Sequence, residues 1–278
     1  MKFFEFIQNL DRRWVFLLIL IVVTVPFFMP LSLPIEITPS VKHIYDRVEE
    51  MSLQNNPKPI LISADFGPEA IPELNPMLMA LLRHCMSKKI PVITMTLHPA
   101  GPGILERAVA MVADEYNAEK GKDYVSLGFG VGSIIMMLQI GEDIKEGFPN
   151  DYYGNDINDL PLMDDVKNYD DMEFVFCMAG SGLYEAWITY AKSQYNATIA
   201  TGVTGTMATD AYPFLQSGQL LGLIGGLKGA AEYETLIDQK DAAYRGMDSQ
   251  SASHILIIIL VILGNIASFV LKEKKENK

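Results

Sequence analysis

The sequence predicts a doubly wound α/β domain that has a mainly parallel, five-stranded sheet and one transmembrane helix at each end. Three observations lead to this fold class. Short apolar segments alternate with segments of helical periodicity, the apolar segments lack polar alternation, and both ends of the chain carry long uncharged stretches. Strands buried on both faces read as continuous apolar runs, and the helices between them provide the crossovers of a parallel sheet.

The first apolar stretch, residues 14–33, contains no charged residue and has about the 20 residues that a membrane-spanning helix needs. It follows a short tail, residues 1–13, that ends in two arginines. A signal peptide would need small residues at a cleavage site, and this stretch has almost none. The pattern therefore favours an uncleaved anchor over a signal peptide.

The second apolar stretch, residues 255–271, is followed by the basic tail 272–278 with four lysines. The positive-inside rule places this tail in the cytoplasm, and the basic residues before the first stretch point the same way. Both termini are then cytoplasmic, and residues 36–252 form an extracytoplasmic domain. Membrane lipid, contacted by two spans, is a predicted partner.

The domain between the spans is strongly acidic. The two tails hold 7 of the 22 basic and 4 of the 34 acidic residues, which leaves a formal charge of −15 for the rest of the chain. Such a domain repels nucleic acid, which excludes that class of partner. It is also unsuited to lying flat on anionic lipid.

The domain begins with a short amphipathic helix within residues 36–58. The expected strands are 59–67, 90–101, 123–132, 173–182 and 198–205. The expected helices lie in the second half of 68–89, in 102–121, directly after the third strand, and in 183–197. The acidic, asparagine-rich segment 142–172 interrupts this alternation, and a loop of that length is usually functional or mobile.

Each expected strand is followed by a glycine-containing turn, and in a parallel sheet these turns share the carboxyl edge, where ligands usually bind. Glycine lets a backbone approach a ligand closely, and helix N-termini offer free N–H groups. The sequence therefore predicts a site for a small polar or anionic ligand, although turns need glycine in any α/β domain. The candidate residues are Asp65, His98, Gly101, Gly103, Gly130, Gly132, Gly180, Ser181, Gly182 and Thr204.

Motifs for catalysis, metals or cofactors are mostly absent. The four histidines are scattered, and the run "GFGVG" does not match a dinucleotide-binding fingerprint, so no cofactor is predicted. Asp151, Asp156 and Asp159 are weak candidates for calcium ligands, but a solvated charge run is the commoner meaning of such a segment. For Cys85 and Cys177, two buried free thiols are favoured over a disulfide.

A glycine-rich run, "GQLLGLIGGLKGAAEYE", follows the last expected strand. At helical spacing its glycines would form one bare or nearly bare face, against which another backbone could pack closely. That partner is either the domain itself or a second subunit, and the latter would make the protein a homo-oligomer. The glycines concerned are Gly218, Gly222, Gly225, Gly226 and Gly229.

Four motifs, "LHPAGPG", "GKDYVSLGF", "FPNDYYG" and "YPFLQSGQLLGLIGGLKGAAEYE", resemble those of an uncharacterised prokaryotic family of membrane-anchored proteins. The resemblance covers most of residues 40–236, and it implies a protein of the prokaryotic cell envelope without adding catalytic residues. A second resemblance, in the order of the early strands and turns, is to the Clp-peptidase and crotonase superfamily. It places Ser133 near the nucleophile but supplies no base.

The sequence leads to three hypotheses about function. The first is a membrane-anchored domain that self-associates and acts in assembly, scaffolding or ligand sensing rather than in catalytic turnover. The second is a membrane-anchored serine hydrolase that uses Ser133. The third is a small-ligand binder at the turns that follow the strands.

Overall fold

The computed structural model describes residues 10–29 and 34–276. The chain divides into two units: an α/β domain, Ile35–Ala243, and a unit made of the terminal segments that precede and follow it. The α/β class and the parallel sheet that the sequence predicts are confirmed. The sheet has six strands rather than five.

All neighbouring strands are parallel, and their order is β3-β2-β1-β4-β5-β6. Every residue of β1, β2, β4 and β5 is buried, because helices cover both faces of the sheet. This explains why these strands read as unbroken apolar runs. The strands are β1 Ile60–Asp65, β2 Val92–Thr96, β3 Tyr124–Phe129, β4 Val175–Ala179, β5 Ile199–Val203 and β6 Leu223–Gly225.

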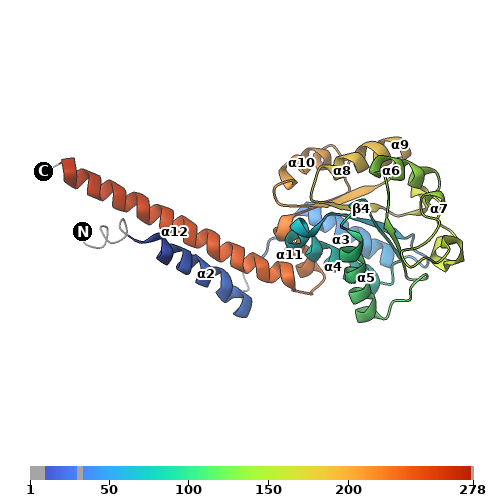
Figure 1. The fold of residues 1–278 in the computed structure, drawn as a ribbon, viewed down its shortest axis with the longest axis horizontal. Coiled ribbons are helices and arrows are strands. Elements are labelled where there is room, and N and C mark those ends of the chain that lie inside the picture. Colours follow the sequence, from blue (N-terminus) through green and yellow to red (C-terminus); the bar gives the residue numbers. More distant parts are fainter. Residues whose placement is uncertain (1–9, 30–33, 277–278) are drawn as a thin grey trace. The chain divides into compact units, whose positions relative to one another are not determined.

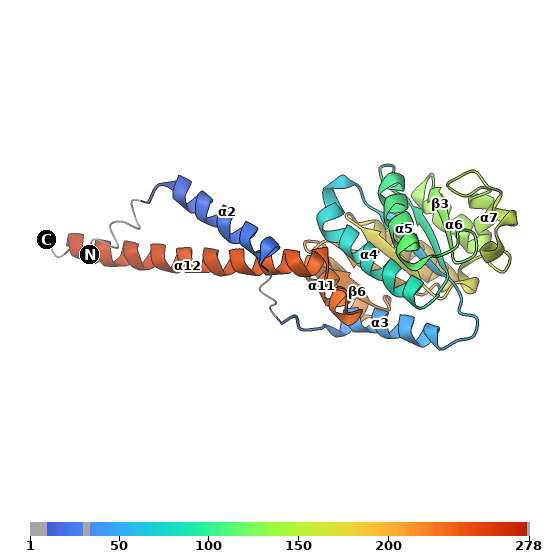
Figure 2. The same ribbon diagram turned by 90° about the horizontal axis from the view of Figure 1, so that it is seen from below.

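Two layers of helices enclose the sheet (Figures 1 and 2). One layer consists of α3 (Pro39–Ser52), α4 (Ile71–Ser87), α5 (Pro102–Tyr116) and α11 (Gly226–Leu236). The opposite layer consists of α6 (Ser133–Glu142), α8 (Leu183–Ala186), α9 (Ser193–Tyr195) and α10 (Ala208–Gln216). A π-helix, Trp187–Lys192, joins α8 to α9.

The acidic segment is an ordered cover for an edge of the sheet rather than an open loop. It contains α7 (Ile144–Gly147) and three 3-10 turns, Ile157–Asp159, Pro161–Met163 and Tyr169–Asp171. Its Tyr152 N–H donates to the Ser126 carbonyl of edge strand β3 at 2.7 Å. An uncovered edge strand invites pairing with other chains, so the segment protects the sheet from association.

The glycine run is not one helix, and the single glycine face predicted for it is wrong. Leu223–Gly225 forms β6, which pairs with β5, and α11 begins only at Gly226. Gly218 has a φ of 74° and ends the turn after α10, a backbone conformation that glycine adopts without strain. The run thus contains the sixth strand of the sheet, which the hydrophobic pattern of the sequence did not predict.

The remaining glycines of this run pack inside the domain. A Cβ on Gly222 would overlap Cγ1 of Ile44 in α3, and one on Gly229 would lie 2.9 Å from Cγ2 of Ile224. A Cβ on Gly226 would lie 2.9 Å from the backbone of Gly205. These glycines therefore pack against their own domain, and a contact with a second subunit stays a prediction.

The terminal unit contains one helix that meets the length and composition of a membrane span, not the two predicted. In the described residues this is α12, Ala242–Glu276, whose apolar part includes the predicted span. The N-terminal helix α2 covers only Arg12–Phe28, 17 residues, and Met29 is already non-helical. The ring of a proline disfavours the helical conformation of the residue before it, and in the sequence Pro30 follows Met29. Residues 30–33 of the predicted first span lie outside the described residues.

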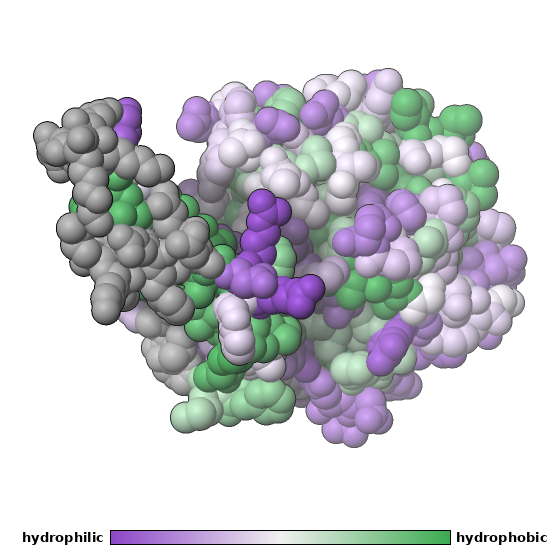
Figure 3. Space-filling view, turned by 60° about the vertical axis from the view of Figure 1, so that its left-hand side comes forward, coloured by the Kyte–Doolittle hydropathy of each residue, from purple (hydrophilic) through white to green (hydrophobic). Residues whose placement is uncertain are grey.

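The face of the α/β domain that Figure 3 shows carries polar side chains with apolar patches among them. Both cysteines are buried and free, as favoured from the sequence. Burial raises the pKa of each thiol to about 12, so both remain protonated at neutral pH.

Candidate functional site

The strand order reverses between β1 and β4, which creates a switch point at the carboxyl edge of the sheet. The chain runs from β1 outwards to β2 and β3, and then returns to the other side of β1 with β4. The loops after β1 and β4 therefore leave towards opposite faces of the sheet. Doubly wound sheets usually form their ligand crevice between two such loops, and this region of the carboxyl edge is called the crevice. The order is that of dinucleotide-binding doubly wound sheets, in which the ligand occupies this position.

The loop after β4 provides free hydrogen-bond donors at this crevice. Gly180, Ser181 and Gly182 are exposed, and within the described residues no hydrogen bond is recorded from the backbone N–H groups of Ser181, Gly182 or Leu183. Gly180 is required by close packing, because a Cβ there would lie 3.1 Å from the Cβ of Ala70. These N–H groups can bind an oxygen acceptor such as a carboxylate, phosphate or carbonyl.

His98 reaches the same crevice from the loop after β2. A Cβ on Gly67, which follows β1, would lie 2.8 Å from Cε1 of His98, so the imidazole lies over the end of β1. Ala100 N–H donates to Nδ1 of His98 at 3.2 Å, which leaves Nε2 as the nitrogen that carries a proton in the neutral ring. The site can therefore offer a side-chain donor besides its backbone N–H groups.

Two glutamates add negative charge along the carboxyl edge, Glu69 beside the loop after β1 and Glu73 beside the loop after β5. Glu69 accepts from Gly67 N–H at 3.2 Å, and Glu73 accepts from Gly205 N–H at 2.7 Å. These bonds use part of the acceptor capacity of each carboxylate and hold the loops after β1 and β5. The negative charges favour a ligand with few negative charges of its own.

Asp65 lies beneath the crevice rather than at its surface, so it is unsuited to the ligand contact that the sequence predicts. Its side chain points towards the helical layer that contains the π-helix, and it is only 1% exposed. Oδ1 accepts from Ser63 Oγ at 2.7 Å and from Leu97 N–H at 2.6 Å, and Oδ2 accepts from Trp187 Nε1 at 2.9 Å. The carboxyl thus joins β1, the β2 loop and the π-helix.

The pKa of Asp65 reflects this burial. Desolvation raises the pKa to about 6, although the bonds from Ser63, Trp187 and Leu97 and the nearby His98 all lower it. Trp187 reaches the carboxyl from the first position of the π-helix, and helices of this type are common near functional sites.

Five other predicted residues are spread along the carboxyl edge, in the turns after β2, β3 and β5. Gly101 packs against Thr96, and Gly130 packs against Leu97 and Met136, so both meet steric needs of their turns. Gly132 has a φ of 72° before α6, Gly103 lies in the first turn of α5, and the Thr204 hydroxyl bonds to Thr206. The structure does not bring these five together.

The hydrolase and calcium hypotheses gain no support. Ser133 begins α6, next to the edge strand β3. In the described part of the chain, its hydroxyl makes no hydrogen bond to a basic side chain that could activate it. Asp151 accepts from Tyr153 N–H and Asn155 N–H within its own turn, and Asp156 caps a 3-10 turn. Among the residues that the structure describes, no group of three or more potential ligands is placed to hold a metal ion.

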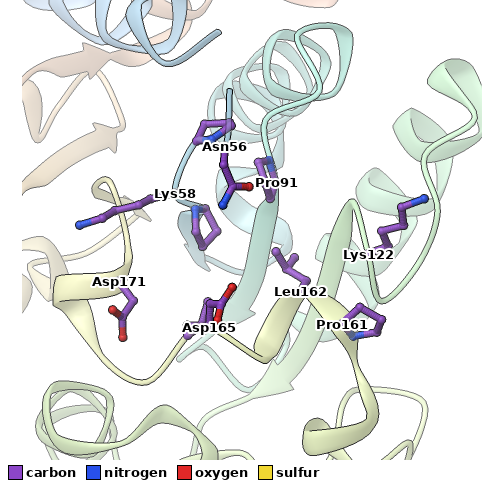
Figure 4. Close-up of a pocket in the computed structure, with 11 residues that line it drawn as sticks. Asn56, Lys58, Pro91, Lys122, Pro161, Leu162, Asp165 and Asp171 are labelled. Carbon is purple, nitrogen blue, oxygen red and sulfur yellow. The ribbon is translucent and has the colours of Figure 1, made fainter. Parts of the chain in front are cut away.

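A separate pocket of about 350 Å³ lies at the opposite, amino-terminal edge (Figure 4). Pro59 and Pro91, which precede β1 and β2, form part of its wall. Lys58 lines it but donates to the Asp170 carbonyl, so its ammonium is already engaged. Doubly wound domains bind ligands at the other edge, which makes this pocket the weaker candidate.

Sequence reasoning missed Ser63, Gly67, Glu69, Glu73 and Trp187. Ser63 and Trp187 lie far apart in the sequence, and what links them is that each donates a hydrogen bond to the Asp65 carboxyl. Gly67 could have been found, since it occupies the turn after the first strand like the glycines that were chosen. Comparison with known proteins adds no assignment: no family model, curated protein or solved structure matches this chain.

Proposed function

We propose that the α/β domain binds a small polar ligand at the β1–β4 switch point and serves as a membrane-anchored sensing or binding domain. The observation that carries this proposal is the set of free N–H groups at residues 181–183, in the partly exposed loop where the strand order reverses. The ligand would present a carboxylate, phosphate or carbonyl oxygen to them, with His98 as a further donor.

Ligand binding should be visible as thermal stabilisation. We would titrate the full chain with acetate, inorganic phosphate and AMP. A bound ligand at one hundred times its Kd stabilises the domain by about 2.7 kcal/mol, or roughly 5–10 °C for a domain of about 200 residues. Gly182→Trp should abolish the shift, because the nearest atom to a Cβ at Gly182 is 4.0 Å away and the indole can occupy the crevice without disturbing the fold.

Ala110→Trp is the matched control, since Ala110 is exposed on α5, and it should leave the shift intact. If none of the three probes raises the melting temperature in the millimolar range, an oxygen-acceptor site at these N–H groups is refuted. If both tryptophan variants retain the shift, the ligand binds elsewhere.

The assembly hypothesis loses the observation on which it rested, because its glycines are divided between a loop, β6 and α11, and all of them except the exposed Gly218 pack within the domain. Self-association stays a prediction. Enzymatic turnover has no supporting constellation among the described residues.

We infer further that α12 anchors the domain in a membrane with its lysine-rich tail in the cytoplasm and the acidic domain on the other side. Support comes from the apolar length of α12 and the four lysines after residue 271. Alkaline phosphatase, which is active only after export, should be inactive when fused after Lys278 and active when inserted after Ala252 in the otherwise complete chain, which keeps the apolar part of α12. The opposite pattern would contradict the topology.

A further inference from the structure

A groove of about 460 Å³ runs between α4 and α5, well within the size range of small-molecule sites. It lies on one helical layer, apart from the switch-point loop 180–182 and from the amino-edge pocket. The residues that line it come from α4, α5, α11, the loop residue Asp241 and the first residue of α12. Its apolar walls are Ile71, Pro76 and Met79 on one side and Ile104, Ala108 and Met111 on the other.

The apolar walls follow from helical spacing. Ile104, Ala108 and Met111 recur at i, i+4 and i+7, so they lie on one face of α5 that is turned towards α4. Met111 is 45% exposed, which is unusual for a large apolar side chain beside a groove. Methionine has a flexible, polarisable side chain that adapts to irregular apolar ligands.

The two arginines of the groove differ in their bonding. Arg83 is held by two bonds to Glu115, at 2.8 and 2.9 Å, and by one to Asp241 at 2.8 Å. Arg107 is exposed, and in the part of the chain that the structure describes no hydrogen bond or ion pair is recorded for it. It lies between Ile104 and Met111 along α5, so an unpaired guanidinium borders the apolar wall.

We propose that this groove binds the acyl chain of a long-chain fatty acid, with the carboxylate paired to Arg107. The apolar walls would contact the chain, and the guanidinium would form a bidentate pair with the head group. Arg83 is unsuited to that role because Glu115 and Asp241 already neutralise it. A dianionic ligand is disfavoured by the same carboxylates and by Glu234.

A lipid-derived ligand also fits the position of the groove in the chain. Ala242, one of its lining residues, is the first residue of α12, the helix with the length and composition of a membrane span. An anchored domain would sample fatty acids that leave the bilayer. This inference does not depend on a ligand at the switch point.

The test measures binding of radiolabelled palmitate to the full chain in lipid nanodiscs, with empty nanodiscs subtracted. Wild type should show saturable binding that is tighter for palmitate than for hexadecanol, which lacks the charge. Arg107→Gln should weaken palmitate binding about tenfold or more and leave hexadecanol unchanged. Met111→Trp should fill the groove and weaken both ligands, without unfolding because Met111 is partly exposed.

Lys192→Gln, which removes one positive charge from the opposite helical layer, is the matched control and should bind like wild type. Gly182→Trp should also bind palmitate normally, which separates this groove from the switch-point site. Non-saturable partition equal to that of empty nanodiscs would overturn the proposal. So would unchanged binding in both Arg107→Gln and Met111→Trp, or recovery of a phospholipid instead of a fatty acid as the bound molecule.

Discussion

Replacing Asp65 with asparagine is expected to change how the stability of the domain depends on pH. Burial raises the pKa of Asp65 from 3.8 to about 6 in the folded chain. The folded state therefore binds the proton more tightly than the unfolded state, and stability is lost as pH rises from about 4 through about 6. A difference of roughly two pKa units corresponds to about 3 kcal/mol.

Asparagine cannot ionise, so it removes this loss. Its amide nitrogen would face Trp187 Nε1–H, however, and the lost hydrogen bond costs about 1–3 kcal/mol at every pH. The variant should thus be less stable than wild type near pH 4 and should gain about 3 kcal/mol relative to wild type by about pH 7. Denaturant unfolding at several pH values measures the difference, and parallel curves for the two proteins would contradict it.

Trp187 offers an independent readout, since the chain has only one other tryptophan, Trp14. In a Trp14→Phe background, the fluorescence of Trp187 should titrate with a midpoint near a pH of about 6, and Asp65→Asn should abolish this transition. Ser63→Ala is the control: it removes one bond that stabilises the carboxylate, so the midpoint should move upwards rather than vanish.

Gly222→Ala is expected to destabilise the domain by about 3 kcal/mol, because the new methyl group has no room. Its Cβ would overlap Cγ1 of Ile44 and lie 2.7 Å from the backbone oxygen of Ser40, both in α3. Relief requires α3 to move away from the sheet. Thermal or denaturant unfolding measures the loss.

Gly182→Ala is the control of equal chemistry, and it should change stability by less than about 0.5 kcal/mol, since its Cβ meets no close neighbour. Gly218→Ala should cost about 1 kcal/mol through its positive φ alone. The native mass should stay unchanged in all three variants. A Gly222→Ala protein that loses subunits but keeps its stability would restore the subunit-contact interpretation of this run.

The sequence by itself was sufficient for the α/β class, the parallel sheet and five of its six strands. The reason is that β1, β2, β4 and β5 are buried on both faces, so their apolar residues are contiguous and visible in a short window. The apolar helix at the C-terminus is equally local in origin. Its length and lack of charge can be read without any knowledge of the fold.

Only the tertiary structure decided what the glycines, the acidic segment and Asp65 do. Leu223–Gly225 is a strand because β5 offers it a partner, and three residues carry no periodic signal of their own. The acidic segment covers β3 through a backbone bond that composition cannot reveal. Asp65 meets Leu97 and Trp187 across 32 and 122 residues, and such distant pairings arise from packing and loop closure rather than from local preference.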